Sequence, residues 1–323
     1  YGAKVISNAR DYYSYNFPVI RTLPKVPVVG IEDIIKDGLH TVIPGQKITW
    51  NQLGLDIPLI FIHSGWRYKH FTSLADEVRK NGGVVIGMFD NNWKGGARQL
   101  LGIVFFRLFL KRKYSAVFVP GLQGLKLAKY LGFDDDDIYQ GLYCGSNKIF
   151  KNTIKITERK KTFIFVGQFI HRKAVIELLD AFKIFRRIHP EWSIRFIGQG
   201  DLERDIDGNK GVTVEPFMQS EGIMKAMNES RVLILPSYVE HWGVVVHEAT
   251  LCGCGILLTS SVGSAVDLAT PENAIIIKKA SVKSLVEAMC KFSNMSDFEF
   301  IRMQEKSIEL SKQNALTKIG IEF

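Results

Sequence analysis

The sequence lacks an apolar run long enough to span a membrane. The longest apolar segment, LLGIVFFRLFL at residues 100–110, contains Arg107 and falls short of the roughly 18 residues that a spanning helix needs. Cysteine is also scarce. The four cysteines form no CxxC pair and have no histidine at zinc spacing, and they stand at Cys144, Cys252, Cys254 and Cys290. We therefore expect reduced thiols in a cytoplasmic protein.

A signal-peptide pattern is also absent. The sequence begins at Tyr1 rather than methionine, which leaves open whether the natural start is included. The 323 residues are 46% hydrophobic and 23% charged, a composition typical of a soluble globular protein. That length suffices for two domains of about 150 residues each.

The net charge of +9 is unevenly distributed. Residues 1–150 carry 19 Lys and Arg against 12 Asp and Glu, whereas residues 151–323 carry 23 against 21. A basic first half is compatible with nucleic acid, anionic lipid or a phosphorylated substrate. Nucleic acid ranks last, because no zinc finger, RRM signature or basic recognition helix accompanies the charge.

From residue 162 onward, short apolar runs alternate with helical segments. The runs TFIFVG, SIRFIG, VTVEPF, RVLILPS, GILLTS and AIIIKK read as strands, and AVIELLDAFKIFRRIHPE and SEGIMKAMNES read as helices. Strands that are apolar throughout indicate a parallel sheet covered on both faces. This half is predicted to be a doubly wound α/β domain.

The first half repeats the theme less regularly. Strands are expected in KVIS, PLIFIHSGW, GVVIGMFDNN and SAVFVPG, and helices in FTSLADEVRKN, ARQLLGIVFFRLFLKR and GLKLAKYLG, while residues 11–55 receive no assignment. A polar, basic stretch before Thr162 suggests domains at 1–150 and 151–323. Two Rossmann-like domains would face a cleft lined by the carboxyl ends of strands.

The stretch PSYVEHWGVVVHEATLCGCG places Glu240 in a loop and Glu248 in an apolar helix. Gly243 allows a sharp turn into a helix that begins near Val244. The unpaired amides at this helix N-terminus suit a diphosphate, and Glu248 would lie one turn further in. The alternative is that Glu248 pairs with a buried lysine and Glu240 is an exposed loop residue.

Together with FVGQFIHRKAVIELLDAF and FIGQGDLE, this stretch resembles the signature of the retaining glycosyltransferases of family 4. The resemblance covers residues 162 to about 292, with several motifs in the order of the family. It is weaker over residues 56–150, where IHSGW, DNNWKG and VPG resemble acceptor domains of polysaccharide-assembling members. The resemblance implies an α/β GT-B fold, with an acceptor domain followed by a donor domain.

The resemblance also implies site residues. Lys173 would hold the donor diphosphate, Glu240 the hydroxyls of the transferred sugar, and Glu248 the ribose. Gln168 stands after Gly167 where the family often has arginine, and Arg172 either supplies the missing charge or is a solvated loop residue. The other expected donor contacts are Gly198, Gly200, Met218 near the base, and the backbone of Trp242, Gly243 and Val244. For Gly198 and Gly200, a plain strand-to-helix turn is the alternative.

Three residues of the first half are candidates by position. His63 ends a predicted strand and is expected near the donor sugar, with a structural role as the alternative. Trp66 and Asp90 are expected on the acceptor side, although Asp90 could equally cap a turn. Acceptor domains of this family normally begin with a strand, a Gly-rich turn and a helix, and residues 1–17 do not show that unit.

The resemblance therefore predicts transfer of a sugar from a nucleotide diphosphate, expected to be UDP-linked, with retention at the anomeric carbon. The expected acceptor is a glycan or a polyprenyl-diphosphate-linked glycan in cell-surface polysaccharide assembly. No metal is expected, and Asp134–Asp137 are interpreted as a solvated loop. A nucleotide-sugar epimerase or phosphorylase of the same fold, or a catalytically silent binding subunit, are the alternatives.

The segment ARQLLGIVFFRLFLKRKY joins large apolar side chains to Arg107, Lys111, Arg112 and Lys113. A helix that is apolar nearly all round is usually packed inside, so we expect its phenylalanines to be buried. The basic residues 111–113 could still attract anionic lipid. The sequence thus predicts weak, salt-sensitive binding at the inner face of the cell membrane.

Overall fold

The computed structural model describes residues 47–313, except positions 54, 65, 67, 68, 94 and 207, together with two short strands near the N-terminus. Those strands, β1 (Val5–Ser7) and β2 (Val28–Gly30), pair in parallel. β1 agrees with the strand expected at KVIS. Apart from β1 and β2, residues 1–46 lie outside the described part of the chain. The expectation for residues 1–17 and most of the unassigned segment 11–55 therefore fall outside it.

The described chain divides into two compact units. One comprises the described residues up to Met88 together with Leu101–Val117, and the other comprises Phe89–Leu100 and the described residues from Phe118 onward. The domain boundary expected near residue 150 stays a prediction.

A four-stranded sheet in the order β3-β4-β5-β6 lies in the first half of the sequence, with β3 and β4 pairing in parallel. Its strands are β3 (Ile60–Ser64), β4 (Val84–Met88), β5 (Ala116–Val119) and β6 (Ile138–Gln140). Its helices and helical turns are η2 (Asn51–Leu53), α3 (Lys69–Lys80), α4 (Ala97–Phe105), η3 (Phe106–Leu110), η4 (Lys111–Lys113), α5 (Gly121–Tyr130) and η5 (Asp135–Asp137). The sequence predicts β3, β4, β5, α3 and α5 correctly and misses β6. Asp134–Asp136 are exposed, and Asp135–Asp137 form the 3₁₀ turn η5 rather than a plain loop.

The long helix expected over residues 97–112 does not form as one regular element. α4 passes into a π-helix, η3, and then into a 3₁₀ turn, η4. The expected burial is right for Phe106, which is fully buried, and wrong for Phe105 and Phe109, which are 53% and 54% exposed. No residue of α4 is buried, so this segment presents most of its apolar side chains outward.

The second half contains a six-stranded parallel sheet in the order β12-β11-β10-β7-β8-β9. The strands are β7 (Thr162–Val166), β8 (Ser193–Ile197), β9 (Val212–Glu215), β10 (Val232–Leu235), β11 (Gly255–Thr259) and β12 (Ala274–Ile277). All six coincide with the predicted apolar runs. Read from β9 to β12, the order is the 3-2-1-4-5-6 arrangement of a doubly wound domain. The α/β fold class is confirmed.

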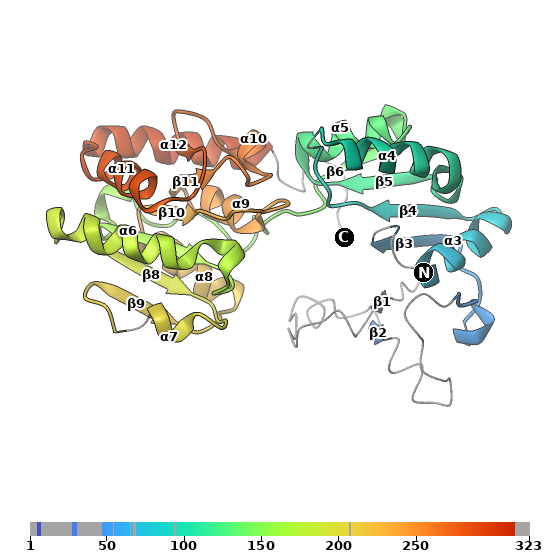
Figure 1. Ribbon diagram of the computed structural model, residues 1–323, viewed down its shortest axis with the longest axis horizontal. Helices are drawn as coiled ribbons and strands as arrows, with labels where there is room; N and C mark the ends of the chain where they lie inside the picture. Colours follow the sequence, from blue (N-terminus) through green and yellow to red (C-terminus); the bar gives the residue numbers. More distant parts are fainter. Residues whose placement is uncertain are drawn as a thin grey trace. The chain divides into compact units, whose positions relative to one another are not determined.

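Helices cover both faces of this sheet (Figure 1). The helices and helical turns of this half are η6 (Ile156–Glu158), η7 (His171–Lys173), α6 (Val175–Ile188), α7 (Glu203–Ile206), α8 (Ser220–Glu229), α9 (Val244–Leu251), α10 (Ala265–Leu268), α11 (Val282–Ser293) and α12 (Asp297–Gln313). α6 packs against α11, and α9 packs against α12. Because right-handed crossovers leave β7 and β10 in opposite directions, α6 and α9 lie on opposite faces.

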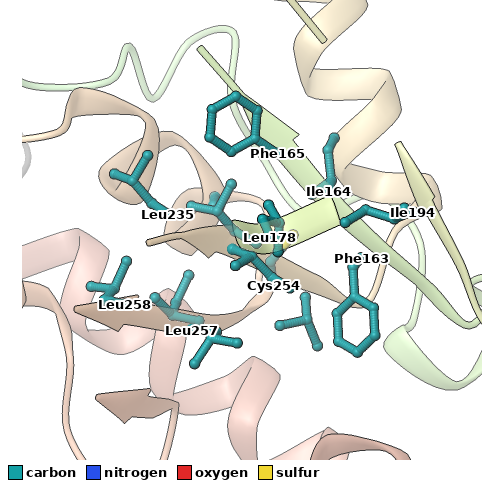
Figure 2. Packing of buried hydrophobic residues seen from close by; sticks show 14 of the residues in the cluster. Phe163, Ile164, Phe165, Leu178, Ile194, Leu235, Cys254, Leu257 and Leu258 are labelled. Carbon is teal, nitrogen blue, oxygen red and sulfur yellow. The ribbon is translucent and has the colours of Figure 1, made fainter. Parts of the chain in front are cut away.

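The core of this domain explains why its strands are apolar throughout. Phe163, Ile164 and Phe165 of β7 are fully buried and pack in the core (Figure 2). All residues of β10 and β11 are buried as well. Each large apolar side chain buried in this way contributes about 1.5–3 kcal/mol to folding. The sheet is therefore a rigid base for the loops that follow its strands.

Candidate active site

The strand order identifies where a ligand would bind in the six-stranded domain. β7 and β10 are neighbours, and the chain leaves them toward opposite edges of the sheet. In doubly wound sheets, ligands bind beyond the carboxyl ends of the two strands at this switch point. The loop after β7 contains Gly167, Gln168, Arg172 and Lys173, and the loop after β10 contains Glu240, Trp242 and Gly243. The topology thus brings together two motifs that are distant in sequence.

The loop after β7 is anchored to the loop after β8 by backbone hydrogen bonds. The amides of Gly167 and Phe169 donate to the carbonyl oxygens of Ile197 and Gln199 at 3.0 and 2.9 Å. The loop then forms the 3₁₀ turn η7, and Ala174 adopts a left-handed conformation (φ 54°) before α6 begins. Lys173 is only 9% exposed as a result.

The glycines of the turn after β8 meet a steric requirement of the chain itself. A β-carbon at Gly198 would lie 2.0 Å from the carbonyl oxygen of Gly167, and one at Gly200 would lie 2.5 Å from that of Phe169. Both have φ near 150°, where other residues are strained. This close approach of two loops supports the turn alternative, and a contact of these glycines with a nucleotide stays a prediction.

Glu240 has a partner: its carboxylate forms a direct ion pair with the ammonium group of Lys173. The same oxygen, Oε2, lies 3.4 Å from Nη1 of Arg172 and 3.5 Å from the Ser237 hydroxyl. The side chains of Glu240 and Lys173 are 13% and 11% exposed, so both charges are largely removed from water. The structure therefore joins the two residues expected to hold the donor's sugar and its diphosphate.

This contact removes one alternative. Lys173 is buried in an ion pair, and Glu240 is not the exposed loop residue that the alternative interpretation requires. Arg172 is exposed, and its guanidinium also donates to the carbonyl oxygen of Val239 at 2.7 Å. It is therefore more than a solvated charge, since it ties the two loops together.

The helix α9 begins at Val244, as predicted. Gly243 precedes it in a left-handed conformation (φ 86°), and Trp242 is buried. The first amides of a helix lack intrahelical partners and carry partial positive charge. α9 starts in the same loop as Glu240, so this N-terminus belongs to the switch-point site.

Glu248, one turn into α9, is half-buried. Burial raises the pKa of its carboxyl group to about 7. Its Cγ packs close to Gly145, where a β-carbon would approach to 2.9 Å. Within the described part of the chain no lysine, arginine or histidine forms an ion pair with Glu248, which disfavours the buried-lysine alternative. A half-buried carboxylate without a cation is the kind of group that ligand hydroxyls can satisfy.

Met218, expected near the base, follows β9 and packs partly buried against the domain core. Sequence reasoning missed Tyr238 and Glu177. The Tyr238 hydroxyl donates to Glu177 at 2.7 Å, and the Tyr238 ring stacks on His171 with centroids 5.4 Å apart. The hydrogen bond to Glu177 raises the pKa of Tyr238 to about 12. The signal in the sequence that could have identified Tyr238 was its place two positions before Glu240.

Of the candidates in the first half, His63 and Trp66 lie in the unit that contains β3, and Asp90 lies just after β4. His63 is 4% exposed, and its ring lies among Phe61, Phe71 and Tyr114 at centroid distances of 5.0, 5.6 and 5.3 Å. This burial favours its structural alternative, and its catalytic role stays a prediction. Trp66 contacts Phe106 at 5.1 Å.

Asp90 follows β4 and is partly buried. Its acceptor-side role, like that of Trp66, stays a prediction.

The described residues contain no group of three or more His, Cys, Asp or Glu arranged to hold a metal ion. They also contain no helix with the length and apolar character required to cross a bilayer.

Comparisons with known proteins agree with this architecture. Residues 146–312 match the family described as "Glycosyl transferases group 1". No curated protein matches the sequence.

Solved structures with the same fold include sucrose-phosphate synthase from Thermosynechococcus elongatus, with TM-score 0.63, 13% identity, and coverage of 84% of this chain and 72% of that one. HepE from Anabaena, solved with UDP and glucose, has TM-score 0.62, 11% identity, and coverage of 80% and 75%. TarM from S. aureus has TM-score 0.62 and 13% identity, with 80% of this chain covering 52% of TarM, about half of its length.

Proposed function

The chain belongs to the group 1 glycosyltransferases, and from this premise we propose that it transfers a sugar from a nucleotide diphosphate, of the UDP-sugar class, with retention at the anomeric carbon. The observation that carries the proposal is the union of Lys173, Glu240 and the α9 N-terminus at the switch point of the six-stranded sheet. HepE, a protein of the same fold, binds UDP and glucose, which supports the donor class.

The proposed chemistry follows from where charge develops. When the bond to the anomeric carbon breaks, negative charge builds on the diphosphate oxygens. Lys173 and the amides at the start of α9 can stabilise that charge, because the loops that carry them are held in place by backbone hydrogen bonds before the reaction. Glu240 would accept hydrogen bonds from sugar hydroxyls, and Glu248 would accept them from the ribose. No step in this scheme needs a metal ion from the protein.

The test has two parts. UDP-, GDP- and ADP-sugars are screened for an increase in melting temperature, and the sugar that stabilises the protein is then offered with glycan and polyprenyl-diphosphate-linked acceptors. Proton NMR of the product gives the anomeric configuration. We expect a UDP-sugar to stabilise and the product to keep the donor's configuration. An inverted product would refute the retaining mechanism, and epimerised donor without transfer would favour the epimerase alternative.

Binding without transfer or epimerisation would favour the silent-subunit alternative. A control with EDTA tests whether transfer needs a metal ion. We expect transfer to persist in the presence of this chelator. We propose that the acceptor is a glycan or a lipid-linked glycan of cell-surface polysaccharide assembly.

We also propose that the protein acts at the cytoplasmic face of the membrane, on the strength of an apolar surface formed by α4 and η3. Its members are large side chains between 53% and 73% exposed, namely Leu101, Val104, Phe105, Leu108 and Phe109. Arg107 and Arg112, both exposed, lie on the same segment. Such a combination binds an anionic bilayer through apolar burial and charge together.

Exposure of these side chains changes the expected salt dependence. Charge attraction is screened by salt, whereas apolar burial is not. We therefore expect sedimentation with anionic vesicles that falls, but does not vanish, at high salt. Phe105→Ser/Phe109→Ser should abolish the salt-resistant part, while Ile188→Ser, at a position 64% exposed on α6, should have no effect. Equal binding by both variants would refute this surface.

A further inference from the structure

The two residues assigned to the donor bind each other directly. Lys173 and Glu240 form a largely buried ion pair, and Oε2 of Glu240 is also approached by Arg172 and Ser237. An ammonium group has three N–H donors, so a phosphate oxygen at Lys173 would either share it with this carboxylate oxygen or replace it. In both arrangements the phosphate and the carboxylate compete for one positive charge, so Glu240 is a competitor for the diphosphate within the site.

The competition cannot be relieved by separating the two loops, because they are joined independently of the ion pair. The Tyr238 amide donates to the carbonyl oxygen of Arg172 at 2.9 Å, and Arg172 donates to that of Val239 at 2.7 Å. The Tyr238 hydroxyl adds a bond to Glu177 at the start of α6. Exchange of partners is therefore a movement of side chains within a fixed frame.

We propose that the Lys173–Glu240 ion pair makes the site discriminate between a sugar nucleotide and the nucleoside diphosphate left after transfer. This inference rests on the proposed function. A sugar nucleotide offers phosphate to Lys173 and hydroxyls to Glu240, so both partners of the pair are satisfied. A nucleoside diphosphate offers only phosphate, and the largely buried carboxylate of Glu240 is left close to another anion.

The ion pair should weaken binding of the nucleoside diphosphate more than binding of the sugar nucleotide. Arg172 and Ser237 remain near Oε2 at 3.4 and 3.5 Å, but Arg172 is exposed, so Lys173 is the main partner of this carboxylate. Loss of that partner is unfavourable for a largely buried charge, so Glu240 competes for Lys173 whenever the sugar is absent. The site then releases the nucleoside diphosphate more readily than it would without the carboxylate. Glu240 acts in this way as a specificity-determining residue that reduces product inhibition.

The experiment measures binding of UDP and of the stabilising UDP-sugar to wild-type protein and to Glu240→Gln by calorimetry. GDP or ADP takes the place of UDP where that is the nucleotide that the wild-type protein binds. The amide preserves shape and removes the charge. We expect UDP to bind the variant about tenfold more tightly, equivalent to about 1.4 kcal/mol. The UDP-sugar should gain less or bind more weakly, because its hydroxyls lose the charged acceptor.

Glu229→Gln is the matched control, since Glu229 forms a partly exposed ion pair with Arg195 at 2.9 Å, on β8 and α8. This variant should bind both ligands as the wild-type protein does. Unchanged or weaker UDP binding by a folded Glu240→Gln protein would overturn the inference alone. Failure of UDP, GDP and ADP to bind the wild-type protein would overturn the proposed function, and the inference with it.

Discussion

Replacement of Glu248 by glutamine should stabilise the ligand-free protein above pH 7 and weaken its binding of a nucleotide. Burial raises the pKa of this carboxyl group from 4.5 to about 7. Between these values the folded protein holds a proton that the unfolded chain releases. The free energy of unfolding therefore falls as pH rises from about 4.5 to 7, because ionisation of Glu248 is less favourable in the folded protein than in the unfolded chain.

The size of the effect follows from the shift. Each pKa unit corresponds to 1.36 kcal/mol, which gives an upper value of about 3 kcal/mol above pH 7. Because the side chain retains some contact with water, we expect about 1.5–3 kcal/mol. His247, whose pKa is lowered mainly by burial, acts in the opposite direction at lower pH. The difference between wild type and Glu248→Gln at each pH removes that contribution.

The assay is urea unfolding from pH 5 to pH 8, combined with nucleotide binding at pH 8. We expect Glu248→Gln to match the wild type near pH 5 and to exceed it at pH 8. Nucleotide affinity should fall by the value of a charged hydrogen bond, about 1.5–3 kcal/mol. A variant that is less stable at pH 8 would show that Glu248 has a cationic partner, and unchanged affinity would remove it from the ribose site.

Three further substitutions test other parts of the structure. Lys173→Ala should reduce transfer at least about 100-fold and also lower the free energy of unfolding by about 1–3 kcal/mol, since it leaves Glu240 half-buried without its main partner; unchanged thermal unfolding would contradict the ion pair. His63→Ala should cost about 2–4 kcal/mol in urea unfolding by opening a cavity, whereas His63→Phe should keep both stability and transfer; a stable His63→Phe protein without transfer would restore the catalytic role. Gly198→Ala should cost at least about 1–3 kcal/mol, because its β-carbon would collide with Gly167, and a wild-type melting temperature would refute the close approach.

The sheet of the second half was predictable because its strands are buried on both faces. β10 and β11 contain only buried residues, so their sequences are short continuous apolar runs, and a length of four or five residues favours a strand over a helix. The turn at Gly243 was predictable as well, since a left-handed residue before a helix favours glycine. β6 was missed because it has three residues, Ile138–Gln140, of which two are exposed.

The segment from α4 to η4 shows where periodicity fails. Apolar residues occur on nearly every side of it, so the sequence does not specify which of them face the core. The passage from α to π geometry at Phe106 also changes the angle between successive side chains, and a 3.6-residue period no longer applies. Phe106 is consequently buried while its neighbour Phe105 is exposed.

The ion pair at the switch point could not be found from spacing, because Lys173 and Glu240 are 67 residues apart. Only the strand order, which places β7 beside β10, brings their loops together. The resemblance assigned each residue to a ligand but did not predict that the two side chains contact each other.

Hydrogen bonds within the protein hold the backbone around Glu240. Its amide and carbonyl are held by Ser261 and Gly263 at 3.3 and 3.0 Å, and the Thr259 hydroxyl donates to the carbonyl oxygen of Ser237 at 2.6 Å. The backbone of this loop is thus fixed from the β11 side and from the η7 side at once. Donor binding within this domain then requires only that two side chains exchange partners, which involves little ordering of the chain. A nucleotide titration should therefore change the surroundings of Lys173 and Glu240 while leaving amide exchange in β7 and β10 unaltered, and widespread change in those strands would contradict a preformed site.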